Sequence, residues 1–472
     1  MLKKGYKGKI LLYIAPLLIS VFLSGSFVRG AYGLTTEEEK KLGKTVLLEV
    51  RKEGNLVRDL NIQALIERIG YSIVDQVGST PFEFKFYVIN TPEVNAFSVP
   101  GGYIFVFTGL IALTENEHEL AGVIAHEIAH VTQRHVSQMI EKSQRLSWAS
   151  LLATLAAMAA GRGGAGSVAG VAMSQGMAGA LQLKYSREIE TDADQNGLHY
   201  LIKAGYDPNG MINFFKKLQK MSVEMAPNIP AYLLDHPLTE NRISLLENLL
   251  QMGPRPTGPF RTFRNYDRIR VRTFVEEMEP NVPVPHFQSL INADSNRLEG
   301  YYGLGLAFRK MGRFDKSMEA LQQAHSLAPE DLDVSRDLGI AYFLSGKLDQ
   351  AIEKLEVVRS VYGEGQDSDL MAIYYLGRGY QEKGDFAKAL PLFLKVQKEG
   401  LEFIDVYRDL GSVYGRMGQK GLSHLYFGKY FELKGERNNA LLHFRTAIDS
   451  LERGSPEREE AQREIKELTS PR

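Results

Sequence analysis

Hydrophobic and polar positions divide the chain into a mixed part and an all-helical part. Residues 35–79 and 185–250 place apolar residues at helical spacing, so we expect helices there. Between these segments lie three short runs rich in aromatic and β-branched residues, which are typical of strands. They cover residues 84–89, 96–99 and 103–107, and the Pro100-Gly101-Gly102 turn predicts that the last two form a hairpin.

A further helix is expected from about Glu115 to Ser147, because glycine and proline are absent from Val123 to Val136. Residues 146–184 then carry almost no charge and are rich in Ala, Gly and Met. Two interpretations of this segment stay open. It is either a helical hairpin packed on the preceding domain or a mobile flap that contacts substrate or a membrane surface.

From residue 298 the apolar pattern repeats itself. A Leu-Gly pair followed three residues later by an aromatic residue occurs four times, at offsets of 34, 38 and 34 residues. The aromatic members are Phe308, Tyr342, Tyr380 and Tyr414. This phased pattern resembles the tetratricopeptide repeat, a helix pair of about 34 residues. We expect the small residues to let neighbouring helices approach closely, and the stack to offer a concave surface to protein partners.

The first residues follow the pattern of a secretory signal. Four lysines precede an apolar run over residues 10–23, which Pro16 interrupts. That run is short for a membrane span, and Ala31-Tyr32-Gly33 supplies the small residues expected before a cleavage point. We therefore expect a cleavable signal peptide over residues 1–33 and a mature protein that works outside the cytoplasm, with an uncleaved anchor as the alternative.

Charge and composition restrict the chemistry. The chain has 56 basic and 57 acidic residues, so a nucleic-acid partner bound through an overall basic surface is excluded. It contains no cysteine, which excludes disulfides, thiolate nucleophiles and cysteine-based metal sites. Any metal ion must therefore be held by histidine, aspartate or glutamate.

One histidine motif carries candidate chemistry. His126 and His130 are four residues apart, so on a helix they lie on one face and can bind one metal ion. Imidazole suits zinc, and Glu127 between them is close enough to take a proton from a metal-bound water. His135, five residues after His130, would fall about 140° round a continuous helix, so we expect at most an indirect contact with the metal.

A catalytic zinc site usually has three protein ligands and one open position. No third histidine follows the motif at short spacing, so the remaining ligand is expected to be a carboxylate on a second helix. Glu190 and Asp194 lie four residues apart, so one can bind the metal while the other hydrogen-bonds a ligating histidine. Glu188 and Asp192 have the same spacing and form the rival pair.

These motifs, taken in order, resemble those of the zinc peptidases related to CAAX prenyl protease and HtpX. The order is HExxH at His126, E-x-x-A-D opening at Glu190, and His236-Pro237 with Arg242 five residues after the proline. With a signal peptide in front and repeats behind, the chain is similar to periplasmic members of that family. The resemblance implies an α+β, zincin-like metalloprotease domain, mostly helical with a small sheet, followed by an all-α tetratricopeptide-repeat solenoid.

The resemblance also implies roles for the metal-site residues. One zinc ion per chain would be held by two histidines and one glutamate, with Glu127 as the catalytic residue and Asp194 in support of a ligand. The ligands are His126, His130 and Glu190.

Two further segments acquire implied roles. The strand that contains Asn95, Ala96 and Phe97 resembles the edge strand to which an extended substrate adds by main-chain hydrogen bonds. His236 and Arg242 lie in one segment for which a regulatory or transition-state role is expected, with His236 near the zinc. There it either fills the fourth coordination position, which keeps the enzyme latent, or donates a hydrogen bond to the transition state.

We therefore expect a metallopeptidase domain over residues 34–252, a proline-rich linker over 253–297 and the repeat domain over 298–468. The implied activity is hydrolysis of misfolded or stalled outer-membrane proteins, with the repeats docking on an outer-membrane assembly complex or on substrates. The flap interpretation of residues 146–184 would add a peripheral membrane contact. The alternative is a non-proteolytic periplasmic chaperone or assembly factor with a vestigial or latent protease site.

Overall fold

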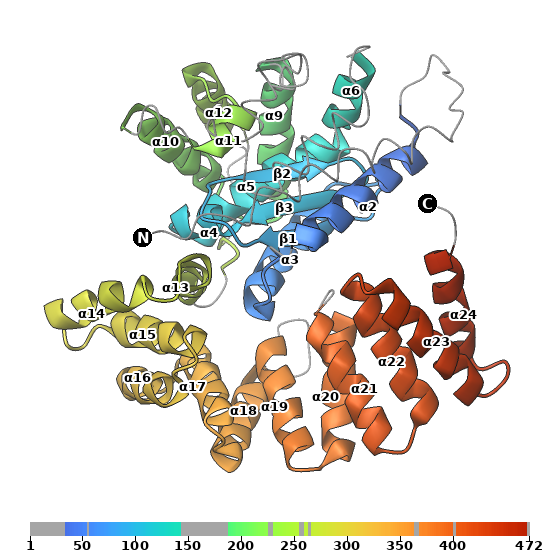
Figure 1. The fold of residues 1–472 in the computed structure, drawn as a ribbon. Helices are drawn as coiled ribbons and strands as arrows, with labels where there is room; N and C mark the ends of the chain where they lie inside the picture. The colour runs from blue at the N-terminus through green and yellow to red at the C-terminus, as the bar shows by residue number, and fades with distance from the viewer. Residues whose placement is uncertain are drawn as a thin grey trace, which may run out of the picture.

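The computed structural model describes residues 34–53, 56–142, 187–224, 230–253, 259–262, 266–362, 368–399 and 403–469. The expected signal peptide and the Ala-, Gly- and Met-rich segment 146–184 lie outside these residues. The chain forms a mixed lobe of helices around a small sheet and a curved stack of helices beside it (Figure 1). This confirms the predicted fold class. Within the part described, no helix is long and apolar enough to cross a membrane.

The sheet of the first lobe has three strands, β1 (Lys85–Ile89), β2 (Ala96–Val99) and β3 (Tyr103–Phe107). Their order is β1-β3-β2, with β1 parallel and β2 antiparallel to the central β3. The predicted hairpin is confirmed, and its turn has φ values of 91° at Gly101 and 97° at Gly102, which glycine adopts readily. Strand β2 therefore lies at one edge of the sheet.

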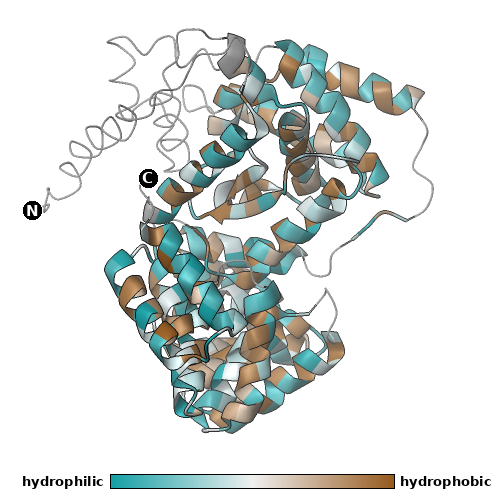
Figure 2. Ribbon diagram, turned by 90° about the vertical axis from the view of Figure 1, so that its right-hand side faces the viewer, coloured by the Kyte–Doolittle hydropathy of each residue, from teal (hydrophilic) through white to brown (hydrophobic). Residues whose placement is uncertain are grey.

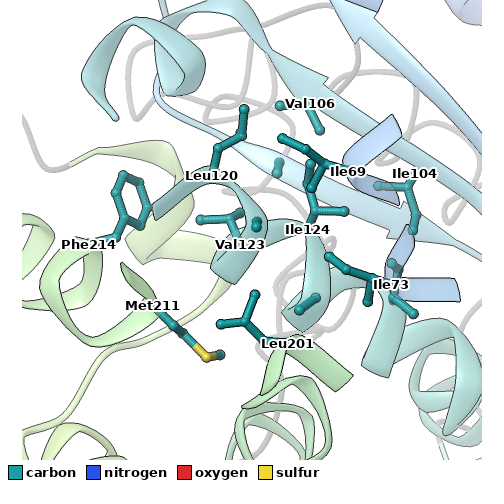
Figure 3. Packing of buried hydrophobic residues seen from close by; sticks show 14 of the residues in the cluster. Ile69, Ile73, Ile104, Val106, Leu120, Val123, Ile124, Leu201, Met211 and Phe214 are labelled. Carbon is teal, nitrogen blue, oxygen red and sulfur yellow. The ribbon is translucent and has the colours of Figure 1, made fainter. Parts of the chain in front are cut away.

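Helices precede and follow this sheet in the first lobe. Before it come α2 (Thr36–Glu53) and α3 (Leu60–Val74); after it come α4 (Thr108–Leu113), α5 (Glu117–Thr132), α6 (His135–Lys142), α9 (Arg187–Lys203), α10 (Asn209–Glu224), α11 (Ala231–Asp235) and α12 (Glu240–Met252). Helix α5 lies at the centre, where its apolar side chains meet others from α3, β3, α9 and α10 (Figure 3). Its position fixes the histidine motif inside the lobe.

The helix expected from Glu115 to Ser147 is interrupted, so that prediction is wrong. Helix α5 ends at Thr132 and α6 begins at His135. Between them Arg134 has a φ of 55°, the one positive φ of a non-glycine residue in the part of the chain that the model covers. A left-handed residue cannot continue a right-handed helix, and no glycine marks the break in the sequence.

The second lobe begins with α13 (Tyr266–Glu277) and α14 (Pro283–Ala293) and continues as antiparallel helix pairs. The pairs are α15 (Leu298–Lys310) with α16 (Phe314–Leu327), α17 (Leu332–Leu344) with α18 (Leu348–Tyr362), α19 (Leu370–Glu382) with α20 (Phe386–Glu399), α21 (Ile404–Arg416) with α22 (Lys420–Leu433), and α23 (Arg437–Ser450) with α24 (Pro456–Thr469). Seen from the side, hydrophilic and hydrophobic residues alternate along these helices, as amphipathic packing requires (Figure 2).

The repeated glycines have two different roles. Gly305 lies against its paired helix, and a Cβ there would be 2.5 Å from Leu321. Gly312, in contrast, has a φ of 71° with no atom close enough to meet a Cβ, so it serves the turn between the helices. The sequence predicted close helix approach at all the small residues. The structure shows it at Gly305 but not at Gly312.

The expected linker, residues 253–297, contains helices that pack on both lobes. On α13, Tyr266 and Ile269 belong to the core of the first lobe. Further along, Val275 and Phe287 belong to the core of the first repeat. A chain cut at residue 252 would therefore lose core side chains of the first lobe, which the proline-rich composition did not indicate.

A buried ion network joins the lobes at the start of α3. Leu60 packs in a hydrophobic cluster otherwise built from the repeats. Beside it Asp59 caps α3 and pairs with Arg272 of α13, whose Nη1 lies 2.6 Å from Oδ2 of Asp337 on α17. These three charged side chains are at most 6% exposed. Arg272 thus pairs with one buried carboxylate from each lobe.

We expect Arg272→Met to destabilise the whole chain. Removal of this guanidinium leaves the Asp59 and Asp337 carboxylates buried without it, which typically costs about 3–5 kcal/mol. The measurement is the free energy of unfolding in urea. Arg297→Met is the matched control, because its pair with Glu299 is on the surface. Equal midpoints for the two variants would contradict the network's role.

Candidate metal centre

Four metal-binding side chains meet inside the first lobe. Helix α5 supplies His126 and His130, α9 supplies Glu190, and His236 follows α11. None of the four is more than 1% exposed. One potential ligand atom from each lies within 4.8 Å of the others.

The spacing of these atoms fits a tetrahedral ion. His126 Nε2 lies 3.0 Å from His130 Nε2 and 3.3 Å from His236 Nδ1. Glu190 Oε1 lies 3.2 Å from His236 Nδ1 and 3.5 Å from His130 Nε2. Bonds of about 2.0–2.1 Å in tetrahedral zinc put neighbouring ligand atoms about 3.3–3.4 Å apart. The cluster therefore fits a zinc ion held by three histidines and one glutamate.

Glu127 lies beside this cluster and is completely buried. Its Oε1 is 3.4 Å from His236 Nε2. Its Oε2 has no hydrogen-bond partner among the residues that the model places. A buried carboxylate oxygen without a partner is costly unless a ligand or water satisfies it, so Glu127 is placed to receive a proton from a molecule in the site.

Asp194 and Arg242 contact the potential ligands on the side away from the metal position. Asp194 Oδ1 is 3.0 Å from His126 Nδ1, so Asp194 can accept that N–H and leave Nε2 free for the metal. Arg242 donates to both oxygens of Asp194, at 2.6 and 2.8 Å, and its Nη1 lies 2.8 Å from Glu190 Oε2. The geometry makes Arg242 a positioning residue for Glu190 and Asp194.

The charges within the cluster shift the pKa values of its members. Burial disfavours protonation of His126, but Asp194 and Glu190 outweigh it and raise its pKa to about 9. Burial and the charge of His126 lower the pKa of His130 well below its usual value. Burial also opposes ionisation of Glu190, yet His236 and His126 hold its pKa well below the usual range. A metal ion that binds here near neutral pH would therefore release a proton.

The rival carboxylate pair is divided between two places. Glu188 is exposed and away from the cluster. Asp192 Oδ2 lies 3.1 Å from His135 Nε2, and His135 Nδ1 lies 3.0 Å from His130 Nδ1. The sequence predicted Asp192 only as a member of the rival metal-site pair and did not connect it with His135, because the break before His135 carries no sequence signal. The available clue was its four-residue spacing from Glu188.

The expected substrate strand has its side chains turned inward. Asn95 donates from Nδ2 to Asp235 Oδ2 at 2.9 Å, and Phe97 stacks on Phe105 with ring centroids 4.9 Å apart. Ala96 is fully buried. The side chains of this segment are therefore buried inside the lobe, and an added strand would have to pair with the main chain of β2. Helix α11 is attached at the start of this strand, since Tyr232 N donates to Val94 O at 3.0 Å.

Comparison with known families agrees with this geometry. Residues 58–250 match the model of Peptidase family M48. The first lobe is thus similar to the M48 peptidases. Residues 298–331 match the Tetratricopeptide repeat model, which confirms the predicted architecture of a peptidase domain followed by repeats.

Individual relatives match parts of this chain. The beta-barrel assembly-enhancing protease of Yersinia pestis is 30% identical over 63% of this chain and 62% of its own length. A putative beta-barrel assembly-enhancing protease of Vibrio cholerae is 31% identical over 65% and 64% of the two chains. The mitochondrial metalloendopeptidase OMA1 of Schizosaccharomyces pombe is 31% identical over 39% and 52%. The chain therefore spans less than two thirds of the length of these curated relatives.

These matches confirm the resemblance to the metallopeptidases and support a hydrolase that acts on peptide bonds. Among solved structures, the crystal structure of MamA covers 33% of this chain and 88% of its own at 23% identity, with a TM-score of 0.29. A likeness at that level says nothing further about this chain.

We expect Glu190→Ala to lose most of its bound zinc and Glu188→Ala to keep it, because only Glu190 reaches the cluster. Elemental analysis of the purified full chain measures both. Zinc lost from Glu188→Ala and retained by Glu190→Ala would show that the wrong carboxylate has been assigned.

Proposed function

We propose that this protein is a zinc-dependent metalloendopeptidase. The observation that carries the proposal is the convergence of His126, His130 and Glu190 beside the buried Glu127. Three ligands of this kind together with a carboxylate that can act as a base are the composition of a catalytic zinc site. The match to Peptidase family M48 over residues 58–250 supports the same activity.

When bound, zinc supplies a Lewis acid that polarises a substrate carbonyl and acidifies water. Glu127 takes the proton from the attacking water and then delivers it to the leaving amine. Asp194 keeps His126 in the tautomer whose Nε2 faces the metal position. Arg242 fixes the orientation of Asp194 and Glu190 through its hydrogen bonds and ion pairs.

We propose misfolded or stalled outer-membrane proteins in the periplasm as the substrates. Two kinds of observation support this. The relatives from Yersinia pestis and Vibrio cholerae are named for beta-barrel assembly. The N-terminal sequence has the pattern of a secretory signal. Tetratricopeptide repeats commonly bind proteins, so the second lobe is proposed to dock on the assembly complex or on substrates.

Glu127→Gln should abolish proteolysis without removing the metal. Loss of a general base typically lowers the rate by about 10²–10⁴-fold, and Glu127 is not among the four side chains that converge on the metal position. Digestion of casein by the full chain, with and without a chelator, measures the activity. Zinc content is measured on the same samples.

The outcome separates an enzyme from an assembly factor. Chelator-sensitive digestion that Glu127→Gln loses supports the peptidase. No digestion by the parent, by zinc-loaded samples or by a His236→Ala variant favours the alternative of a non-proteolytic chaperone.

His236 favours a latent form of the enzyme. Its Nδ1 lies 3.3 Å from His126 Nε2 and 3.2 Å from Glu190 Oε1, so it can complete the tetrahedron that a catalytic site leaves open. The segment that carries it is attached to the start of β2 through Tyr232 and Asp235. We propose that His236 excludes water until a substrate strand that adds to β2 loosens this attachment.

At equal zinc content, His236→Ala should therefore raise basal casein digestion above that of the parent, because a coordination position becomes open to water. His199→Ala is the control, since His199 is exposed on α9. A fall of about 100-fold would instead assign His236 to transition-state stabilisation. Unchanged activity would remove it from the mechanism.

A further inference from the structure

Behind His130 lies a chain of hydrogen-bonding groups that the proposed mechanism does not use. His130 Nδ1 lies 3.0 Å from His135 Nδ1, and His135 Nε2 lies 3.1 Å from Asp192 Oδ2. The His135 side chain is 4% exposed, whereas that of Asp192 is 47% exposed. The chain therefore runs from the buried metal centre to the surface of α9. We refer to these three residues as the His130 relay.

The tautomers along the relay agree with metal binding. If His130 Nε2 faces the metal, its Nδ1 carries the proton and donates to His135 Nδ1. His135 then carries its own proton on Nε2 and donates to the Asp192 carboxylate. Because the Asp192 carboxylate can only accept, it determines which nitrogen of His135 is protonated, and His135 in turn determines the tautomer of His130. The opposite set of tautomers would place a proton on His130 Nε2, where the metal belongs.

An unusual backbone conformation brings His135 to this place. On a continuous helix His135 would lie about 140° from His130 and could not reach it. Arg134 has a φ of 55°, which is costly for a residue other than glycine, and it ends α5 so that the chain turns back at His135. Arg134 is held in turn by Glu39 of α2 and by the carbonyl oxygen of Leu34, which its Nη2 meets at 2.6 Å.

His126, the other histidine of the motif, contacts a carboxylate without an intervening residue. His126 Nδ1 meets Asp194 directly, and Arg242 fixes that carboxylate. Helix α9 thus supplies the potential ligand Glu190 and, two residues apart, a carboxylate for each motif histidine. Asp194 acts directly, whereas Asp192 acts through His135.

We propose that His135 and Asp192 are positioning residues that hold His130 in its metal-binding tautomer and orientation. This inference rests on the proposed metal site and goes beyond it, because it gives a function to residues that bind neither the metal nor the substrate. Partners of this kind typically change metal affinity by about 10–100-fold.

The test measures zinc affinity of the full chain by competition with a chromophoric chelator. His135→Leu and Asp192→Asn should each weaken zinc binding by about 10–100-fold. His135→Gln should bind more tightly than His135→Leu, because its side-chain oxygen can again accept from His130. The double variant His135→Leu/Asp192→Asn should bind no more weakly than His135→Leu, since both changes act through one path.

Matched controls separate the relay from general damage. Glu188→Gln and His199→Leu alter exposed residues of α9 and should bind zinc as the parent does. The visible spectrum of the cobalt-substituted protein should change in the relay variants and stay unchanged in the controls, because it reports on ligand orientation. If His135→Leu does not fold, the half-exposed Asp192 still permits the test through Asp192→Asn.

Two results overturn the inference. Zinc affinity and cobalt spectra equal to those of the parent in folded relay variants would refute it while leaving the proposed function intact. A parent chain that binds no zinc would refute the proposed function and this inference together.

Discussion

The burial of two histidines, two glutamates and an aspartate around one point is the constraint on which the first lobe depends. His126, Glu127, His130, Glu190 and Asp194 are each at most 1% exposed. Such groups are costly to remove from water unless an ion and hydrogen bonds compensate for them. The largely buried helix α5, its packing against α9 and the buried Arg242 all serve that compensation, and the potential ligand atoms at 3.0–3.5 Å leave room for one cation.

The supports of this centre come from places far apart in the sequence. Arg242 reaches Asp194 across 48 residues, and Asp192 reaches His135 across 57. Arg134, which turns the chain at His135, is held by Glu39 on the first helix described. A change in α2 could therefore alter the metal site through backbone geometry alone. Residues outside the cluster of potential ligands thus contact the residues within it.

Buried ion pairs also connect the two lobes. Asp59, Arg272 and Asp337 belong to α3, α13 and α17, and Arg272 pairs with both carboxylates in the interior. Leu60 extends the joint with apolar packing against the repeats. The repeats are therefore part of one structure with the peptidase-like lobe, and the segment between residues 253 and 297 is a structural bridge that supplies core residues to both.

The sequence alone determined the fold class, the hairpin and the phase of the repeats, because these depend on local periodicity and turn residues. It also restricted the metal ligands to His126, His130 and one of two carboxylate pairs, since helical spacing defines a shared face. Only the tertiary structure decided that Glu190 and His236 enter the cluster and that Asp192 contacts His135. These outcomes depend on how α9 and α11 pack against α5, and on a left-handed residue at Arg134. Neither packing between distant segments nor a strained dihedral held by remote contacts leaves a pattern along the chain.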